Sequence, residues 1–173
     1  MNRRILLLAL GPGVVALLLT TAAGALEPST ASSVIELNSS LGSGTTHCPF
    51  GGVAADSLNK PDATRASGFT VPAGRVLVLT DVEFNTVAAG LPGNLITFTL
   101  ARETSGAVNQ ITSDISATTG VDGAVDARLS LRGAIVKSGV TLCVQCFDHS
   151  THGLIANPAD CGATIHGFLA NDT

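Results

Sequence analysis

The chain has 173 residues, of which 45% are hydrophobic and 13% are charged, and it contains no Trp and no Tyr. Its nine Lys and Arg and thirteen Asp and Glu leave a net charge of −4 at pH 7, and the basic residues are scattered along the sequence. Because binding to phosphates needs clustered Lys and Arg, no nucleic-acid partner is expected. The missing Trp and Tyr also disfavour sugar-binding and protein-binding sites built on aromatic platforms.

The N-terminus predicts export. Arg3 and Arg4 precede an apolar run over residues 5–19, and small residues follow up to Ala25. This is the layout of a secretory signal peptide, so residues 1–25 are predicted to be cleaved. The alternative is an uncleaved membrane anchor, since the apolar run approaches the length of a membrane-spanning helix. The mature chain then keeps seven basic and thirteen acidic residues, a net charge of −6. We expect a secreted, periplasmic or extracellular protein without stable membrane insertion after cleavage.

The mature chain predicts one domain behind a flexible lead-in. Residues 26–47 are rich in Ser, Thr and Gly, and only SSVIEL within them has the composition of a strand. Residues 48–173 are long enough to form a single domain with its own core.

From residue 69 onwards, short β-type segments alternate with turns rich in Gly, Pro, Asn and Asp. In chain order, strands are expected at residues 75–87, 94–102, 108–116, 124–136, 140–147 and 162–170. The first is apolar on both faces over 76–79 and then alternates, and in the second Thr97 and Thr99 lie opposite the apolar face. The pattern predicts an all-β, antiparallel β-sandwich stapled by disulfides. A jelly-roll-like topology is favoured over an immunoglobulin-like one, because the core Trp of the latter is missing.

The four cysteines are predicted to form two disulfides. Side chains alternate along a strand, so Cys146 lies in the core-facing phase of its strand, as Cys161 does in the last strand, whereas Cys143 points to the opposite face. The preferred pairing is therefore Cys146–Cys161 with Cys48–Cys143. A Cys143–Cys146 bond is the alternative, and it needs a β-bulge.

A transition-metal site is the competing interpretation of the same stretch. Cys143, Cys146, His149 and His152 recur at intervals of three, and thiolates with imidazoles are good ligands for zinc or copper. Exported thiols tend to oxidise, so disulfides are preferred and no metal or other cofactor is expected. His149 and His152 are then polar residues of an exposed loop.

Two pairs of carboxylates are further candidates. Asp81 and Glu83 project from the same face of one strand and could perform acid–base chemistry or bind calcium; the solvated face of a sheet is the preferred interpretation. Asp122 and Asp126 flank a turn that could hold calcium, although their spacing does not match an EF-hand.

No catalytic residue can be assigned from the sequence. There is no G-x-S-x-G motif, and His166 lies on the polar face of the last strand without an identifiable nucleophile. The favoured function is an exported, non-enzymatic binding or surface-interaction module for an unknown extracellular ligand or protein. The alternatives are an exported metal-binding protein that uses His149 and His152, and a secreted hydrolase.

Overall fold

The computed structural model describes part of the chain, including nearly all of the predicted sandwich. The described residues are 34–39, 48, 52–60, 64–86, 91–104, 107–112, 114–155 and 160–172. The predicted signal peptide, residues 1–25, lies outside them. Within these ranges all regular elements are strands, and a helix that could span a membrane is absent from them.

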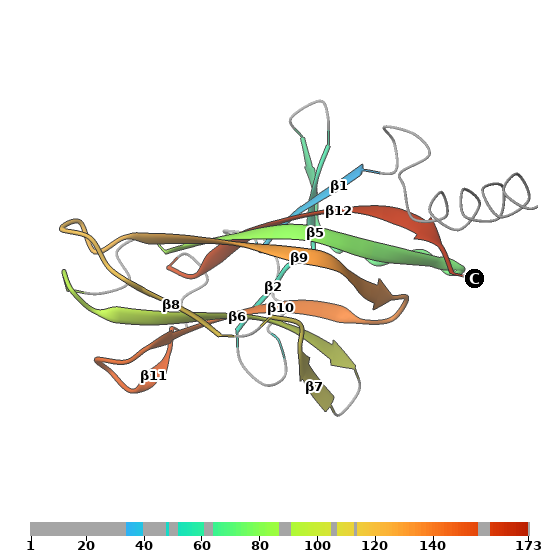
Figure 1. The fold of residues 1–173 in the computed structure, drawn as a ribbon. Helices are drawn as coiled ribbons and strands as arrows, with labels where there is room; N and C mark the ends of the chain where they lie inside the picture. Colours follow the sequence, from blue (N-terminus) through green and yellow to red (C-terminus); the bar gives the residue numbers. More distant parts are fainter. Residues whose placement is uncertain are drawn as a thin grey trace, which may run out of the picture.

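Two antiparallel sheets stack face to face (Figure 1). Sheet A has the order β4-β3-β1-β12-β5-β9, with bounds Arg65–Ala66, Ser57–Asn59, Val34–Asn38, Gly162–Asn171, Arg75–Thr86 and Val125–Lys137. Sheet B has the order β11-β10-β6-β7, with bounds Gly153–Leu154, Thr141–Asp148, Leu95–Thr104 and Ala107–Gln110. Two short strands complete sheet B, since β2 (Val53–Ala54) pairs with β10 and β8 (Ile115–Thr118) pairs with β6.

The strand order is that of a jelly roll. The first strand pairs with the last (β1 with β12), β2 pairs with β10, β5 pairs with β9, and the middle strand β6 pairs with β7 and β8. A chain doubled back on itself and then wrapped into two sheets produces this nested pairing, which defines the double-sheet jelly roll. The predicted all-β sandwich and its jelly-roll-like topology are confirmed.

The main core lies between the sheets and follows from alternation along the strands. Phe84 of β5 and Phe98 of β6 are almost completely buried and stack across the interface with ring centroids 5.3 Å apart. Burying one such side chain contributes about 1.5–3 kcal/mol. The predicted two-sided burial over residues 76–79 is also present: Leu77 enters the main core, and Val78 enters a small cluster on the outer face of sheet A.

A β-bulge in β5 changes which side chains point outward. Strand β12 pairs with Leu79 and with Asp81 through consecutive residues, so Thr80 has no partner on β12. Because of this extra residue, Leu79 and Val82 both reach the core, and Thr80 and Asp81 both stay outside it. The bulge therefore places two adjacent polar side chains on the outer face of sheet A.

Three details differ from the sequence-based expectations. The strand expected in the lead-in is Val34–Asn38, and it lies between β3 and β12. The domain therefore extends ahead of residue 48. The single strand expected at 108–116 is two short strands, β7 and β8, and a further short strand, β11, lies between the strands expected at 140–147 and 162–170.

Both disulfides of the preferred pairing are present. Cys146 of β10 is bonded to Cys161, which directly precedes β12, so this bond ties sheet B to sheet A through the core. Cys48 is bonded to Cys143 and packs with it against Ala54 in a separate buried cluster. Both bonds constrain the unfolded chain and so stabilise the fold, and Cys146–Cys161 is the one that joins the two sheets.

Candidate functional site

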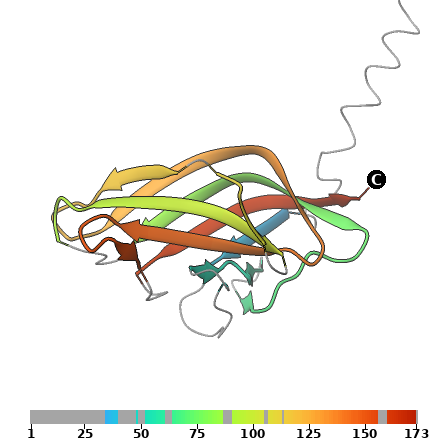
Figure 2. The ribbon, with the colours of Figure 1, turned by 90° about the horizontal axis from the view of Figure 1, so that it is seen from below.

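The outer face of sheet B carries an ordered row of side chains. The register aligns Leu154 of β11, Phe147 of β10, Thr97 of β6 and Ser116 of β8 as direct cross-strand neighbours. Figure 2 views the molecule from the side of this sheet and shows β6 and β10 running side by side across it. Alternation along each strand sends these four side chains away from the core, so they form one continuous line on the surface.

A second line of polar side chains lies next to the first. Gln145 of β10 is the cross-strand neighbour of Thr99 of β6. The Thr99 hydroxyl donates a hydrogen bond of 2.7 Å to Asp114 Oδ1, and the side-chain amide of Gln110 donates to the same oxygen over 3.5 Å. Asp114 is thereby held over the sheet at the end of the row.

Together the two lines form an open groove of about 370 Å³. Its lining residues are Thr97, Thr99, Gln110, Asp114, Ser116, Gln145, Phe147, His149 and Leu154. This volume lies at the lower end of the range of small-molecule sites. The lining combines hydroxyls, amides, one carboxylate and one imidazole with an apolar end.

His149 closes one side of the groove. Its Nε2 lies 2.8 Å from the Thr97 hydroxyl, which in turn lies 2.7 Å from the Ser116 hydroxyl. The imidazole also meets the Phe147 ring edge to face, with centroids 5.0 Å apart. These contacts fix the ring and the hydroxyls in one geometry, so the polar atoms of the groove are preorganised.

The turn that carries His149 is held by Asp148 at the end of β10. The backbone NH and the hydroxyl of Ser150 donate hydrogen bonds of 2.8 and 2.7 Å to Asp148 Oδ1. Burial by itself raises the pKa of Asp148, but the hydrogen bonds from Ser150 and Thr151 outweigh it and keep the pKa below its usual value. The carboxylate is therefore ionised at neutral pH and fixes the position of His149.

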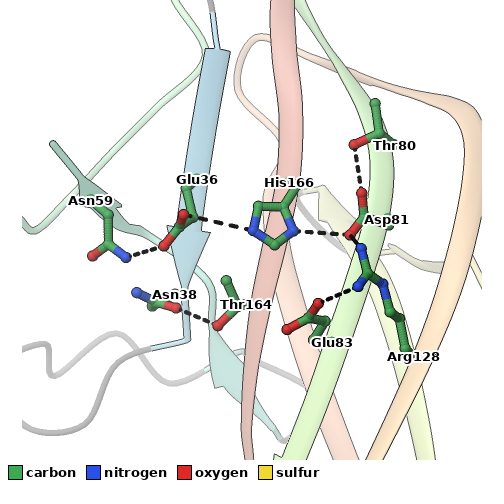
Figure 3. Close-up of polar contacts among 9 residues, drawn as sticks. All are labelled: Glu36, Asn38, Asn59, Thr80, Asp81, Glu83, Arg128, Thr164 and His166. Atoms are coloured by element: carbon green, nitrogen blue, oxygen red, sulfur yellow. Dashed lines mark hydrogen bonds and ion pairs between the residues drawn. The ribbon is translucent and has the colours of Figure 1, made fainter. Parts of the chain in front are cut away.

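A second polar constellation lies on the outer face of sheet A (Figure 3). His166 of β12 is paired in register with Asp81 of β5 on one side and with Glu36 of β1 on the other. Its Nδ1 lies 3.0 Å from Asp81 Oδ1, and its Nε2 lies 3.6 Å from Glu36 Oε2. Glu36 also accepts a hydrogen bond from the side-chain amide of Asn59. The imidazole therefore links three strands of the sheet.

Arg128 of β9 completes this constellation. Its guanidinium contacts Asp81 at 3.0 Å and Glu83 at 2.9 Å. Burial alone raises the pKa of Asp81, but the hydrogen bond from Thr80, the hydrogen bond and charge of His166 and the charge of Arg128 together hold the pKa below its usual value. Asp81 is the common acceptor of the group.

The constellation on sheet A has the chemistry of a structural network. The ligand atoms of Asp81, Glu83 and His166 lie within 4.8 Å of one another, a donor set that could hold a metal ion. The guanidinium of Arg128 already bridges the two carboxylates as their cation. His166 Nε2 faces the Glu36 carboxylate instead of a hydroxyl, so the group is not a nucleophile–His–Asp triad.

The structure separates the other predicted metal ligands. Cys143 and Cys146 are in disulfides, and His149 contacts Thr97 in the groove. His152 is exposed in the following turn with a φ of 54°. Within the described ranges, no group of three or more metal-ligating side chains includes either histidine. The alternative set of two thiolates and two imidazoles is therefore excluded, because the sulfurs are bonded in pairs.

The alternative calcium pair, Asp122 and Asp126, is not assembled either. Asp122 accepts a hydrogen bond from the backbone NH of Ala124 within its own turn, and Asp126 is exposed on β9. In the described part of the chain, neither carboxylate belongs to a group of three metal-ligating side chains. Asp122 thus acts as a turn residue.

A second hollow of about 170 Å³ opens at one end of the sandwich. Its lining is mainly apolar and includes Leu37, Phe69, Val71, Leu77 and Val140. It is less than half the size of the groove on sheet B and offers few groups that could orient a ligand.

The sequence predicts that two side chains of the groove point away from the core, but it does not predict the groove itself. The alternation along the second strand places Thr97 and Thr99 on the non-core face. Asp114 and Ser116 carry no signal of their own, since they fall in a segment of weak strand character. Their adjacency to Thr97 depends on the pairing of β8 with β6.

Comparisons with known proteins add little to this description. No family model matches the sequence, and no curated protein matches it either. Among solved structures, the crystal structure of murine APRIL at pH 5.0 aligns with 79% of this chain and 98% of that chain, with 13% identity and a TM-score of 0.35. An alignment this loose decides neither topology nor function; the fold class follows from the strand order of the chain itself.

Proposed function

We propose that this protein is an exported, non-enzymatic binding module that recognises its ligand in the groove on the outer face of sheet B. The observation that carries the proposal is the preorganised row of polar side chains in that groove, in which Thr97 contacts both Ser116 and His149. Export is supported by the secretory layout of the N-terminus and by two disulfides, which persist in oxidising compartments.

Binding is favoured over catalysis by the contacts of the groove. A catalytic serine or threonine needs a histidine base that a third group orients. The Thr97 hydroxyl contacts the imidazole of His149, whereas the Ser116 hydroxyl contacts Thr97, so the orienting third group decides the question. Among the described residues, no carboxylate contacts His149, since that of Asp148 is held by Ser150. The hydroxyls of the groove are therefore suited to hydrogen bonding with a ligand and lack an activated nucleophile.

The proposal is tested by mapping ligand contacts with amide chemical shifts of the ¹⁵N-labelled mature protein. The probes are uncharged oligosaccharides, a hexapeptide mixture and small dicarboxylates. At least one class is expected to shift the amides of β6, β8 and β10 around Thr97. The Thr97→Val variant removes the central hydroxyl and is expected to weaken that binding about tenfold, since it leaves the partners of a hydrogen-bond network unmatched.

Thr164→Val is the matched control, because it removes a threonine hydroxyl from the outer face of sheet A. It is expected to leave binding unchanged. Shifts confined to sheet A or to the apolar hollow, or the absence of shifts with all three classes, would contradict the proposed function.

A further inference from the structure

We infer that the groove on sheet B takes a neutral, polyhydroxylated ligand, of which a saccharide is the chemical class. The inference rests on the proposed function and names the ligand of that same site. Three properties of the groove carry it: its charge, its balance of donors and acceptors, and its apolar end.

The charge of the groove disfavours anions. Its lining contains one carboxylate, that of Asp114, one imidazole, that of His149, and no Lys or Arg. An anionic ligand would approach Asp114 without a fixed cation to compensate its charge. Phosphorylated or carboxylated ligands are therefore disfavoured.

The hydrogen-bonding groups disfavour a purely cationic ligand as well. The side chains of Gln110 and Gln145 each combine an amide donor with a carbonyl acceptor, and the Thr97 and Ser116 hydroxyls can act as either. An ammonium group only donates, so it could use only the acceptors of this mixed lining. Sugar hydroxyls both donate and accept, and they match this mixed lining.

Asp114 is placed to select such hydroxyls. It accepts hydrogen bonds from Thr99 and Gln110, and both end on Oδ1. A carboxylate can accept about four hydrogen bonds, so Asp114 has acceptor capacity beyond these two. Hydrogen bonds to an ionised acceptor are about twice as strong as neutral ones, which makes Asp114 the strongest single contact for a ligand hydroxyl.

The apolar end of the groove suits the C–H face of a sugar ring. Phe147 and Leu154 are cross-strand neighbours, and Leu154 is 43% exposed. The Phe147 ring is held by the edge-to-face contact with His149, so its position is set before a ligand arrives. This platform is smaller than one built from Trp or Tyr, so we expect polar contacts to supply most of the specificity.

The test uses the ¹⁵N-labelled mature protein and named probes. Cellohexaose, laminarihexaose, maltohexaose and hexa-N-acetylchitohexaose represent neutral saccharides; hexagalacturonate and spermine are the anionic and cationic comparisons. At least one neutral saccharide is expected to shift the amides of β6, β8 and β10, and neither charged probe is expected to do so. Asp114→Asn keeps the shape and can still accept from Thr99, and it is expected to weaken saccharide binding about tenfold.

Asp126→Asn is the matched control, because it neutralises an exposed carboxylate on the opposite sheet. It is expected to bind as the wild type does. If a peptide, hexagalacturonate or spermine binds the groove and no neutral saccharide does, the ligand class is overturned and the proposed function stands. If no probe of either experiment shifts the groove amides, both are overturned. Equal saccharide binding by Asp114→Asn and the wild type also refutes the assignment of Asp114.

Discussion

Replacing Asp81 by Asn tests whether the constellation on sheet A is a structural network. Asp81 has a side chain only 21% exposed and contacts His166, Arg128 and Thr80. The pair with Arg128, whose side chain is 67% exposed, contributes at most about 0.5 kcal/mol. The hydrogen bonds of His166 and Thr80 contribute about 1 kcal/mol together. Asp81→Asn is therefore expected to lower the free energy of unfolding by about 1.5 kcal/mol at pH 6.

The loss should depend on pH in a defined direction. The native environment holds the pKa of Asp81 below its usual value of 3.8, so its ionised form stabilises the folded state. That stabilisation is complete above about pH 5, and it is lost as the pH falls through the folded-state pKa. The amide introduced by Asp81→Asn does not titrate, so the difference between wild type and variant is expected to shrink as the solution is acidified to pH 3.

The measurement is urea-induced unfolding, followed by far-UV circular dichroism, at pH 6 and pH 3 with the disulfides intact. Glu83→Gln is the matched control, because it removes one exposed pair with the same arginine and is expected to cost less than about 0.5 kcal/mol. An equal difference at both pH values, or no difference at pH 6, would refute the assignment of Asp81 as the central acceptor.

The remaining predictions concern the architecture that presents these surfaces. In Gly167→Ala the new Cβ would overlap the backbone oxygen of Val78, which cannot move aside as a side chain can, so we expect the free energy of unfolding in urea to fall by about 2–3 kcal/mol. Gly153→Ala is the control, because its nearest contact is 3.9 Å, and it is expected to lower the free energy of unfolding by less than about 1 kcal/mol. Equal losses in the two variants would be inconsistent with the packing. Replacing Cys48 and Cys143 together by Ala removes a cross-link between residues 95 apart in the chain, and it is expected to lower the free energy of unfolding in urea by up to about 4.7 kcal/mol. A decrease of less than about 1 kcal/mol would show that the bond contributes little.

Much of the face assignment was determined by the sequence, because side-chain direction within one strand is a local property with a period of two residues. That period places Cys146 and Cys161 toward the core and Cys143 away from it. It also places Asp81, Glu83 and His166 on polar faces, and the structure has them there. The all-β class followed in the same way from short alternating segments separated by turn residues.

Only the tertiary structure decided which strands became neighbours. The pairing of β12 with β5 brings together Asp81 and His166, which are 85 residues apart in the chain. The pairing of β8 with β6 likewise sets Ser116 beside Thr97 and so forms the groove. Alternation says which face a side chain occupies but nothing about the strand beside it. Which strands pair depends on long-range loop closure, on core packing and on the bulge at Thr80, and a local sequence pattern determines none of these.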